Sequence, residues 1–94
     1  MYITECVWLD QFVDKIIRKH QVFPEEVEEV FCNDPFVKKL ENGDVKGEDL
    51  YLAFGRTDAG RYLSVFFVYK TDKRAIVISA RDMTKQERTI YGKR

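Results

Sequence analysis

The first third of the chain has the spacing of two amphipathic helices. From Leu9 to His20 the apolar residues recur at steps of three and four, which gathers them into one stripe. A second helix is predicted to start at 23–26, where Pro24 suits the first helical position and two glutamates suit the positive end of the helix dipole. It ends at 33–35, because the residue before Pro35 resists helical dihedral angles. Before both helices, residues 2–7 alternate weakly, which predicts a short strand.

The rest of the chain has the pattern of strands joined by short turns. Strands are predicted at 36–40, 50–56, 61–70 and 74–80, with turn signals at 41–44, 57–60 and 71–73. Segment 61–70 is apolar and aromatic on both faces, which is typical of a central strand. The short turns make the last three strands antiparallel neighbours. Residues 84–87 (Thr-Lys-Gln-Glu) match a capping box and predict a final helix to about Gly92.

This order of elements indicates the α+β class. We expect one domain over residues 1–94, in which an antiparallel meander packs against two N-terminal helices and carries a C-terminal helix. Of the 94 residues, 45% are hydrophobic, which excludes a disordered chain. The longest apolar run is too short to span a bilayer and the N-terminus lacks the pattern of a signal peptide. Cys6 and Cys32 are expected to be packing residues, and a reducing, cytoplasmic setting is expected.

Charge is balanced over the whole chain but not along it. Sixteen Lys and Arg face sixteen Asp and Glu, so a globally basic nucleic-acid binder is not indicated. Residues 1–50, however, carry a net charge of −6 and residues 51–94 a net charge of +6. This asymmetry permits a basic face for an anionic substrate. The alternative is that the charges are only solvated and the two halves interleave in space.

His20 is the only histidine, and it ends the apolar stripe of the first predicted helix. One interpretation is a half-buried residue at a helix C-terminus, where a cation is favourable. The other is a general acid or base, because histidine titrates near neutral pH. Lys19 beside it is either a phosphate ligand or a solvated lysine. A single histidine and two separated cysteines argue against a metal site, and there is no glycine-rich phosphate loop.

Three arginines occupy better-defined positions. Arg56 and Arg81 end predicted strands, and the alternation places Arg81 on one face with Val77 and Ser79. Arg88 lies on the predicted last helix, three residues before Tyr91 and on the same helix face. Arginines on a rigid sheet can make bidentate contacts with phosphate. The alternative for each of these arginines is that it forms only a surface ion pair with a nearby carboxylate.

Several short motifs of the sequence, in their order and spacing, resemble the BrnT family of type II toxins. The specific part is the block Ile78-Ser79-Ala80-Arg81 followed by Glu87-Arg88 and Tyr91. The resemblance extends over nearly the whole chain through further short matches: Trp8, Arg18-Lys19-His20-Gln21-Val22, Glu29-Val30-Phe31, Gly47-Glu48, Gly55-Arg56-Thr57, Gly60-Arg61 and Asp82-Met83-Thr84.

The resemblance implies a RelE-like fold and a metal-independent, cofactor-free endoribonuclease. It also implies a BrnA-like antitoxin with a ribbon-helix-helix domain, through which operator DNA is bound only indirectly. The implied reaction is attack of a ribose 2′-hydroxyl on the adjacent phosphate, which needs a base, an acid and donors for the phosphorane charge. On the matched positions, His20 or Glu48 would be the acid or base. Lys19, Arg56 and Arg81 would hold the phosphate and stabilise its charge, and Arg88 would bind the RNA. Tyr91 would stack on a base or donate a proton.

The sequence also departs from the family pattern. Gln21 stands where many relatives have glycine, and Leu50 where many carry arginine. Ile16 replaces a common asparagine and Phe12 a lysine. If the missing arginine belongs to the active site, the chain is a weak or inactive nuclease that serves as a protein-binding or regulatory module. A third hypothesis is a binder of single-stranded nucleic acid that stacks bases on Tyr and Arg.

Overall fold

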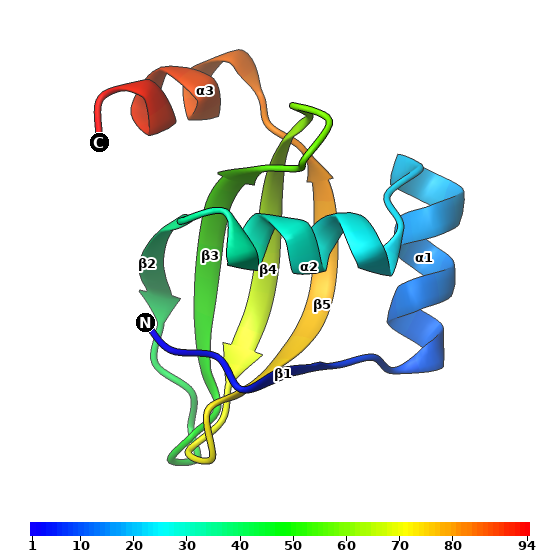
Figure 1. The fold of residues 1–94 in the computed structure, drawn as a ribbon. Coiled ribbons are helices and arrows are strands. Elements are labelled where there is room, and N and C mark those ends of the chain that lie inside the picture. The colour runs from blue at the N-terminus through cyan, green and yellow to red at the C-terminus, as the bar shows by residue number, and fades with distance from the viewer.

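The computed structural model describes all residues from 1 to 94 and contains one five-stranded sheet with three helices (Figure 1). The strands lie side by side in the order β1-β5-β4-β3-β2. β2 to β5 form the antiparallel meander, whereas β1 joins the edge of β5 in parallel. The elements are β1 (Glu5–Val7), α1 (Asp10–His20), α2 (Pro24–Cys32), β2 (Phe36–Glu41), β3 (Asp49–Arg56), β4 (Tyr62–Tyr69), β5 (Arg74–Asp82) and α3 (Lys85–Gly92).

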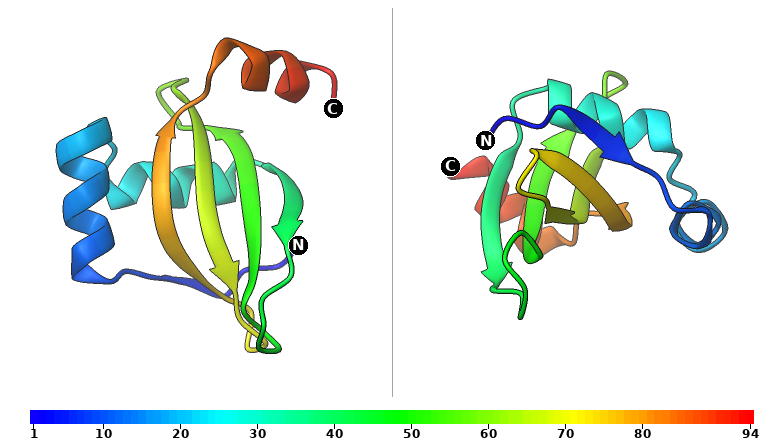
Figure 2. Two further views of the ribbon diagram at one scale, coloured as in Figure 1. Left: turned by 180° about the vertical axis from the view of Figure 1, so that it is seen from behind. Right: turned by 90° about the horizontal axis from the view of Figure 1, so that it is seen from below.

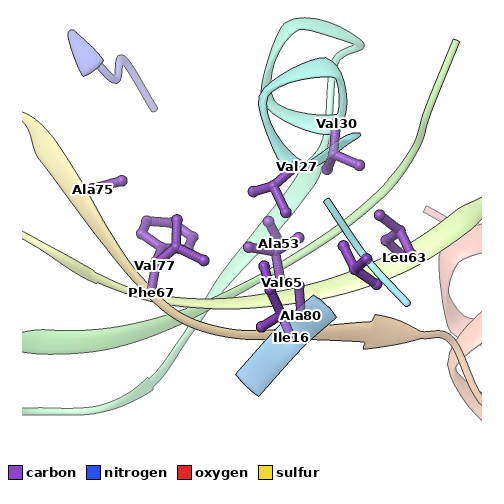
Figure 3. Packing of buried hydrophobic residues seen from close by; sticks show 11 residues of the cluster. Ile16, Val27, Val30, Ala53, Leu63, Val65, Phe67, Ala75, Val77 and Ala80 are labelled. Carbon is purple, nitrogen blue, oxygen red and sulfur yellow. The ribbon is translucent and has the colours of Figure 1, made fainter. Parts of the chain in front are cut away.

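The main core lies between one face of the sheet and the two N-terminal helices. α1 packs along β5, and α2 crosses the sheet over β3 and β4 (Figure 1). Alternate residues of the strands supply one side of this core, and the apolar stripes of α1 and α2 supply the other. Figure 3 shows these side chains converging between the layers. The fully buried members are Ile16, Val22, Val27, Val30, Ala53, Leu63, Val65, Phe67, Ala75, Val77 and Ala80.

α2 approaches β3 closely, and a glycine allows it to do so. A Cβ added to Gly55 would lie 2.7 Å from Cγ1 of Val30, a buried residue of α2. Real Cβ atoms do not approach other carbons so closely, so only glycine fits between the helix and the strand at this crossing. The contact fixes α2 against the end of β3 that carries Arg56.

The opposite face of the sheet is crossed by no helix. Figure 2, seen from behind, shows this face open except at one end, where α3 lies over it. α3 begins as its sequence predicted: Thr84 accepts a hydrogen bond from the backbone N–H of Glu87, and Glu87 accepts one from the backbone N–H of Thr84. A second, smaller apolar cluster lies under α3 and consists of Leu52, Phe54, Met83 and Tyr91.

The predicted α+β class and element order are confirmed, with three differences of detail. β1 spans three residues rather than six, and it pairs in parallel with β5. The connection from β2 to β3 is a loop over 42–48 rather than a tight hairpin, and the backbone N–H of Gly43 donates to the carboxylate of Asp49 in it. β5 runs on to Asp82, so that Arg81 lies within the strand. No helix has both the length and the apolar character needed to cross a membrane.

Candidate functional site

Three arginines and two tyrosines gather at the end of the open face that α3 covers. Tyr62 and Tyr91 pack edge to face, with ring centroids 6.0 Å apart. The guanidinium carbons of Arg88 and Arg56 lie 4.0 and 5.2 Å from the Tyr62 ring centroid. That of Arg94 lies 4.0 Å from the Tyr91 ring centroid, and its Nη2 donates to the Tyr91 hydroxyl. We call these five residues the Arg–Tyr cluster. Stacking against the rings holds the guanidinium groups in place without neutralising them.

None of the three arginines in the Arg–Tyr cluster is paired with a carboxylate. Seven ion pairs occur in the structure, and all of them involve other cations. The charge asymmetry of the sequence explains these unpaired arginines, because residues 51–94 contain ten Lys and Arg but only four Asp and Glu. Three of those carboxylates pair with other arginines: Asp72, Asp82 and Glu87. The cluster is therefore a local concentration of positive charge on a neutral protein.

Arg81 lies on the same face but is held by a carboxylate. Its Nη1 and Nη2 donate to the two oxygens of Glu87 at 2.6 and 2.9 Å, and its guanidinium lies 5.3 Å from the Phe66 ring centroid. Glu87 also accepts from the Ser64 hydroxyl and the Thr84 N–H. The hydrogen bond from Arg81, reinforced by those from Thr84 and Ser64, lowers the pKa of Glu87 to about 2. This ion pair joins β5 to α3. It neutralises much of the charge of Arg81, whereas the arginines of the Arg–Tyr cluster have no carboxylate partner.

Arg81 and Val77 lie on opposite faces of β5, whereas the sequence predicted that they share one face. Ser79 and Arg81 share one face of β5, since they pair with Phe66 and Ser64 of β4. Val77, however, pairs with Phe67 and lies in the main core on the other face. The register shifts between Phe66 and Phe67, and this β-bulge reverses the alternation at Ile78. The expectation that Val77 and Arg81 share a face was therefore wrong.

His20 and Lys19 lie on the helix-covered side of the sheet. His20 is the last residue of α1 and is half-buried, whereas Lys19 is exposed. Arg61 holds this helix end: its guanidinium donates to the carbonyls of His20 and Gln21 at 2.9 and 2.7 Å. The same guanidinium pairs with Asp82, and this hydrogen bond lowers the pKa of the Asp82 carboxyl. Asp82 follows Arg81 and points to the opposite face, so His20 and Arg81 lie on opposite faces of β5 near its C-terminal end.

Glu48 lies at the other end of the sheet. It is exposed in the loop before β3 and pairs with Lys70 at 3.6 Å. Arg56 ends the same strand, and an eight-residue strand is roughly 23 Å long. The structure thus brings together Arg56, Arg88 and Tyr91, with Arg81 on the same face. It does not gather His20, Lys19 or Glu48 with them.

Sequence reasoning missed Tyr62 and Arg94. Tyr62 is the partner of Arg56 across the β3–β4 hairpin, a pairing that the turn at 57–60 could have indicated. Arg94 follows Tyr91 by three residues, the same separation that links Arg88 to Tyr91 on one helix face. Nowhere in the structure do three or more His, Cys, Asp or Glu side chains come close enough together to hold a metal ion. What the Arg–Tyr cluster can do is bind anions and stack aromatic rings or bases.

Comparisons with known proteins bear on the fold and the family of this chain. No curated protein sequence matches the chain. The crystal structure of the Brucella abortus ribonuclease toxin BrnT is similar, with a TM-score of 0.62 and 18% sequence identity over 86% of this chain and 97% of that one. At that identity the similarity shows the fold. A family model, described as the BrnT ribonuclease toxin of type II toxin–antitoxin systems, matches residues 8–87. The match extends from Trp8 to Glu87, and the chain belongs to the BrnT family of toxins.

Proposed function

We propose that this protein is an endoribonuclease toxin and that the Arg–Tyr cluster binds its RNA substrate. The observation that carries the proposal is that Arg56, Arg88 and Arg94 converge on two tyrosines with no carboxylate to neutralise them. Phosphates supply the missing negative charge, and bases of an unpaired strand stack on guanidinium planes and tyrosine rings. Family membership supports RNA as the polyanion.

The reaction we propose is metal-independent transesterification. The ribose 2′-oxygen loses its proton to a base and bonds to the adjacent phosphorus, while the bond from phosphorus to the 5′-oxygen breaks and that oxygen takes up a proton. The products are a 2′,3′-cyclic phosphate and a 5′-hydroxyl. Extra negative charge develops on the phosphoryl oxygens in the transition state, and the guanidinium groups of Arg56 and Arg88 stabilise it. Arg81 contributes when phosphate competes with Glu87 for the N–H donors on Nη1 and Nη2.

His20 is the proposed general acid or base, because it is the only imidazole in the chain. It lies on the opposite face of β5 from Arg81, close to the strand's C-terminal residue Asp82. For both residues to act on one phosphate, the RNA must lie across this end of the sheet. Lys19, exposed beside His20, would then contact the strand on that side. Glu48 lies in the loop before β3, at the opposite end of this strand from Arg56. Its proposed role is therefore limited to a contact with a more distant part of the RNA.

We further propose that a BrnA-like antitoxin with a ribbon-helix-helix domain neutralises the protein and connects it to operator DNA. Family membership supports an antitoxin partner. A short gene encoding such a protein beside the gene for this chain would agree with the proposal. Coexpression of that neighbour should abolish any growth arrest that the chain causes alone.

Cleavage of a defined single-stranded RNA by the purified protein tests the enzymatic proposal. The wild-type protein should produce fragments ending in 2′,3′-cyclic phosphate, and His20→Ala and Arg81→Ala should each lower the rate on the order of a hundred-fold. Arg18→Ala is the control, because Arg18 is an exposed arginine paired with Asp14 on α1. Unchanged rates in both variants would remove these two residues from the active site. An absence of cleavage by the wild type would overturn the nuclease proposal.

Two observations favour a second candidate function. Arg81 is already paired with a carboxylate that accepts from both of its terminal nitrogens, and Leu50 stands where the family resemblance implies an arginine two residues after the Gly-Glu pair. Both features reduce the charge available for catalysis, so the chain is alternatively an inactive member that binds its antitoxin and regulates. In that case the protein accumulates harmlessly in cells and still forms the antitoxin complex.

A further inference from the structure

A polar hollow of about 410 Å³ opens beside the Arg–Tyr cluster, between the β3–β4 turn and the C-terminal end of α3. Two guanidinium groups and one carboxylate line it, so it offers both donors and an acceptor. Its lining residues are Asn33, Arg56, Thr57, Asp58, Tyr91 and Arg94. Because Arg56 and Tyr91 also belong to the Arg–Tyr cluster, a nucleotide in this hollow would be continuous with RNA on the cluster.

The carboxylate of Asp58 is fixed in position but not neutralised. Its Oδ1 accepts from Nδ2 of Asn33 at 2.9 Å, and the backbone N–H of Asp58 donates to Glu29 at 3.0 Å. Asn33 is fixed in turn by a hydrogen bond to the Arg56 carbonyl. Asp58 takes part in none of the seven ion pairs, although Arg56 and Arg94 line the same hollow. Oδ2 accepts no hydrogen bond from the protein, and Oδ1 retains a second lone pair.

This combination of groups selects among the components of RNA. A phosphate only accepts hydrogen bonds and is repelled by a carboxylate. Guanine carries two adjacent donors, N1–H and the 2-amino group, which a carboxylate can accept together, and its O6 and N7 accept from arginine. In adenine and cytosine the amino group adjoins an unprotonated ring nitrogen, which a carboxylate repels. Uracil has one donor, between two carbonyl groups.

We propose that the hollow is a guanine-binding subsite, in which Asp58 accepts from the Watson–Crick edge of the base and Arg56 or Arg94 donates to its acceptor edge. The inference rests on the proposed function, since it takes the ligand to be RNA bound at the Arg–Tyr cluster. It gives the protein a base preference, and cleavage would be directed to sites next to guanine. A carboxylate at Asp58 is what distinguishes this subsite from a simple phosphate site.

Binding of uncleavable RNA separates this inference from the nuclease proposal. The probes are fluorescent 2′-O-methyl oligouridines that carry guanine, adenine, cytosine or hypoxanthine at one central position, and affinity is measured by anisotropy. The 2′-O-methyl group removes the attacking hydroxyl, so the result is independent of cleavage. We expect roughly ten-fold tighter binding of the guanine probe than of the adenine probe, and weaker binding of hypoxanthine, which lacks the 2-amino group.

Asp58→Asn is the matched variant. The amide oxygen of the new side chain can still accept from Asn33, so the fold should be kept, and a thermal unfolding curve checks this. The amide nitrogen in place of Oδ2 meets the donors of guanine, so the guanine preference should fall to about one. Asp44→Asn, in the exposed loop before β3, should leave the preference unchanged.

The outcomes are distinct for the two proposals. Equal affinity for all four probes, no binding of any of them, or a guanine preference that survives Asp58→Asn would each overturn the subsite. RNA cleavage without a base preference would overturn the subsite and leave the nuclease intact. A guanine preference in a protein that cleaves nothing would support the subsite and overturn the nuclease.

Discussion

Glu87 shows how one residue can serve the fold and the site together. It completes the capping box of α3, accepts from the Ser64 hydroxyl and accepts from both terminal nitrogens of the Arg81 guanidinium. The hydrogen bond from Arg81 is the main cause that lowers the pKa of Glu87 to about 2, whereas burial of the side chain, which is only 16% exposed, acts in the opposite direction. The capping box was readable from the sequence. The pairing with Arg81 was not, because it depends on where β5 ends relative to α3.

Glu87→Gln should reduce stability at neutral pH and much less in acid. A carboxyl whose pKa falls from 4.5 to about 2 on folding contributes stability above pH 4.5, and the contribution is lost as the pH falls from 4.5 through 2. The full contribution corresponds to at most about 3 kcal/mol. Urea unfolding of both proteins at pH 7 and pH 3 measures it. Asp44→Asn is the control, and an equal loss at both pH values would contradict the ion-pair account.

Gln21 illustrates a residue whose departure from the family pattern has a structural meaning. It is the C-cap of α1 and has a φ of 52°, in the left-handed region that favours glycine. The glycine that the family resemblance implies at this position would suit the same left-handed C-cap, because glycine adopts a positive φ without a steric penalty. In this chain the Gln21 carbonyl is held by Arg61, which stabilises the same helix end by another route.

At the scale of elements, the boundaries of helices and strands were predicted well because each has a clear local cause. Hydrophobic spacing, Pro24, Pro35 and the capping box at 84–87 act within a few residues of the chain. The parallel pairing of β1 with β5 depends on residues nearly 70 positions apart, and no local pattern contains it. The prediction that Arg81 and Val77 share a face failed for a related reason. The β-bulge at Ile78 inserts one extra residue, which reverses the alternation on which the prediction relied.

The contact of α2 with β3 gives a prediction at this scale. Gly55→Ala places a Cβ about 2.7 Å from Val30 Cγ1, so helix and strand must move apart, and overpacking of this kind costs about 1–3 kcal/mol. Denaturant unfolding measures the loss. Gly92→Ala is the matched control, because a Cβ there has no atom within 4 Å and alanine favours the helix. Equal stability of Gly55→Ala and the wild type would show that the two elements are not tightly packed.

At the scale of the whole molecule, the charge asymmetry of the sequence becomes a charged site. All five members of the Arg–Tyr cluster come from residues 51–94, the half with net charge +6. The sequence predicted Arg56, Arg88 and Tyr91 as candidates, and the fold brings them together. The sequence could not predict that His20 and Arg81 lie on opposite faces of β5. The position of α1 against the sheet is set by packing that only the tertiary structure defines. The roles of His20 and Glu48 therefore remain predictions.

The affinity of two charge-matched double variants for single-stranded RNA tests most directly whether the Arg–Tyr cluster is the RNA-binding site. Arg56→Ala with Arg88→Ala and Arg18→Ala with Arg74→Ala each remove two positive charges, but only the first pair belongs to the cluster. Anisotropy titrations with a 2′-O-methyl oligonucleotide at several salt concentrations give both affinity and its salt dependence. We predict that the cluster variant binds at least ten-fold more weakly and that the slope of log K against log salt falls by about 1.4, whereas the control pair changes little. Equal losses in the two variants would contradict the account, because binding would then follow net charge rather than this site.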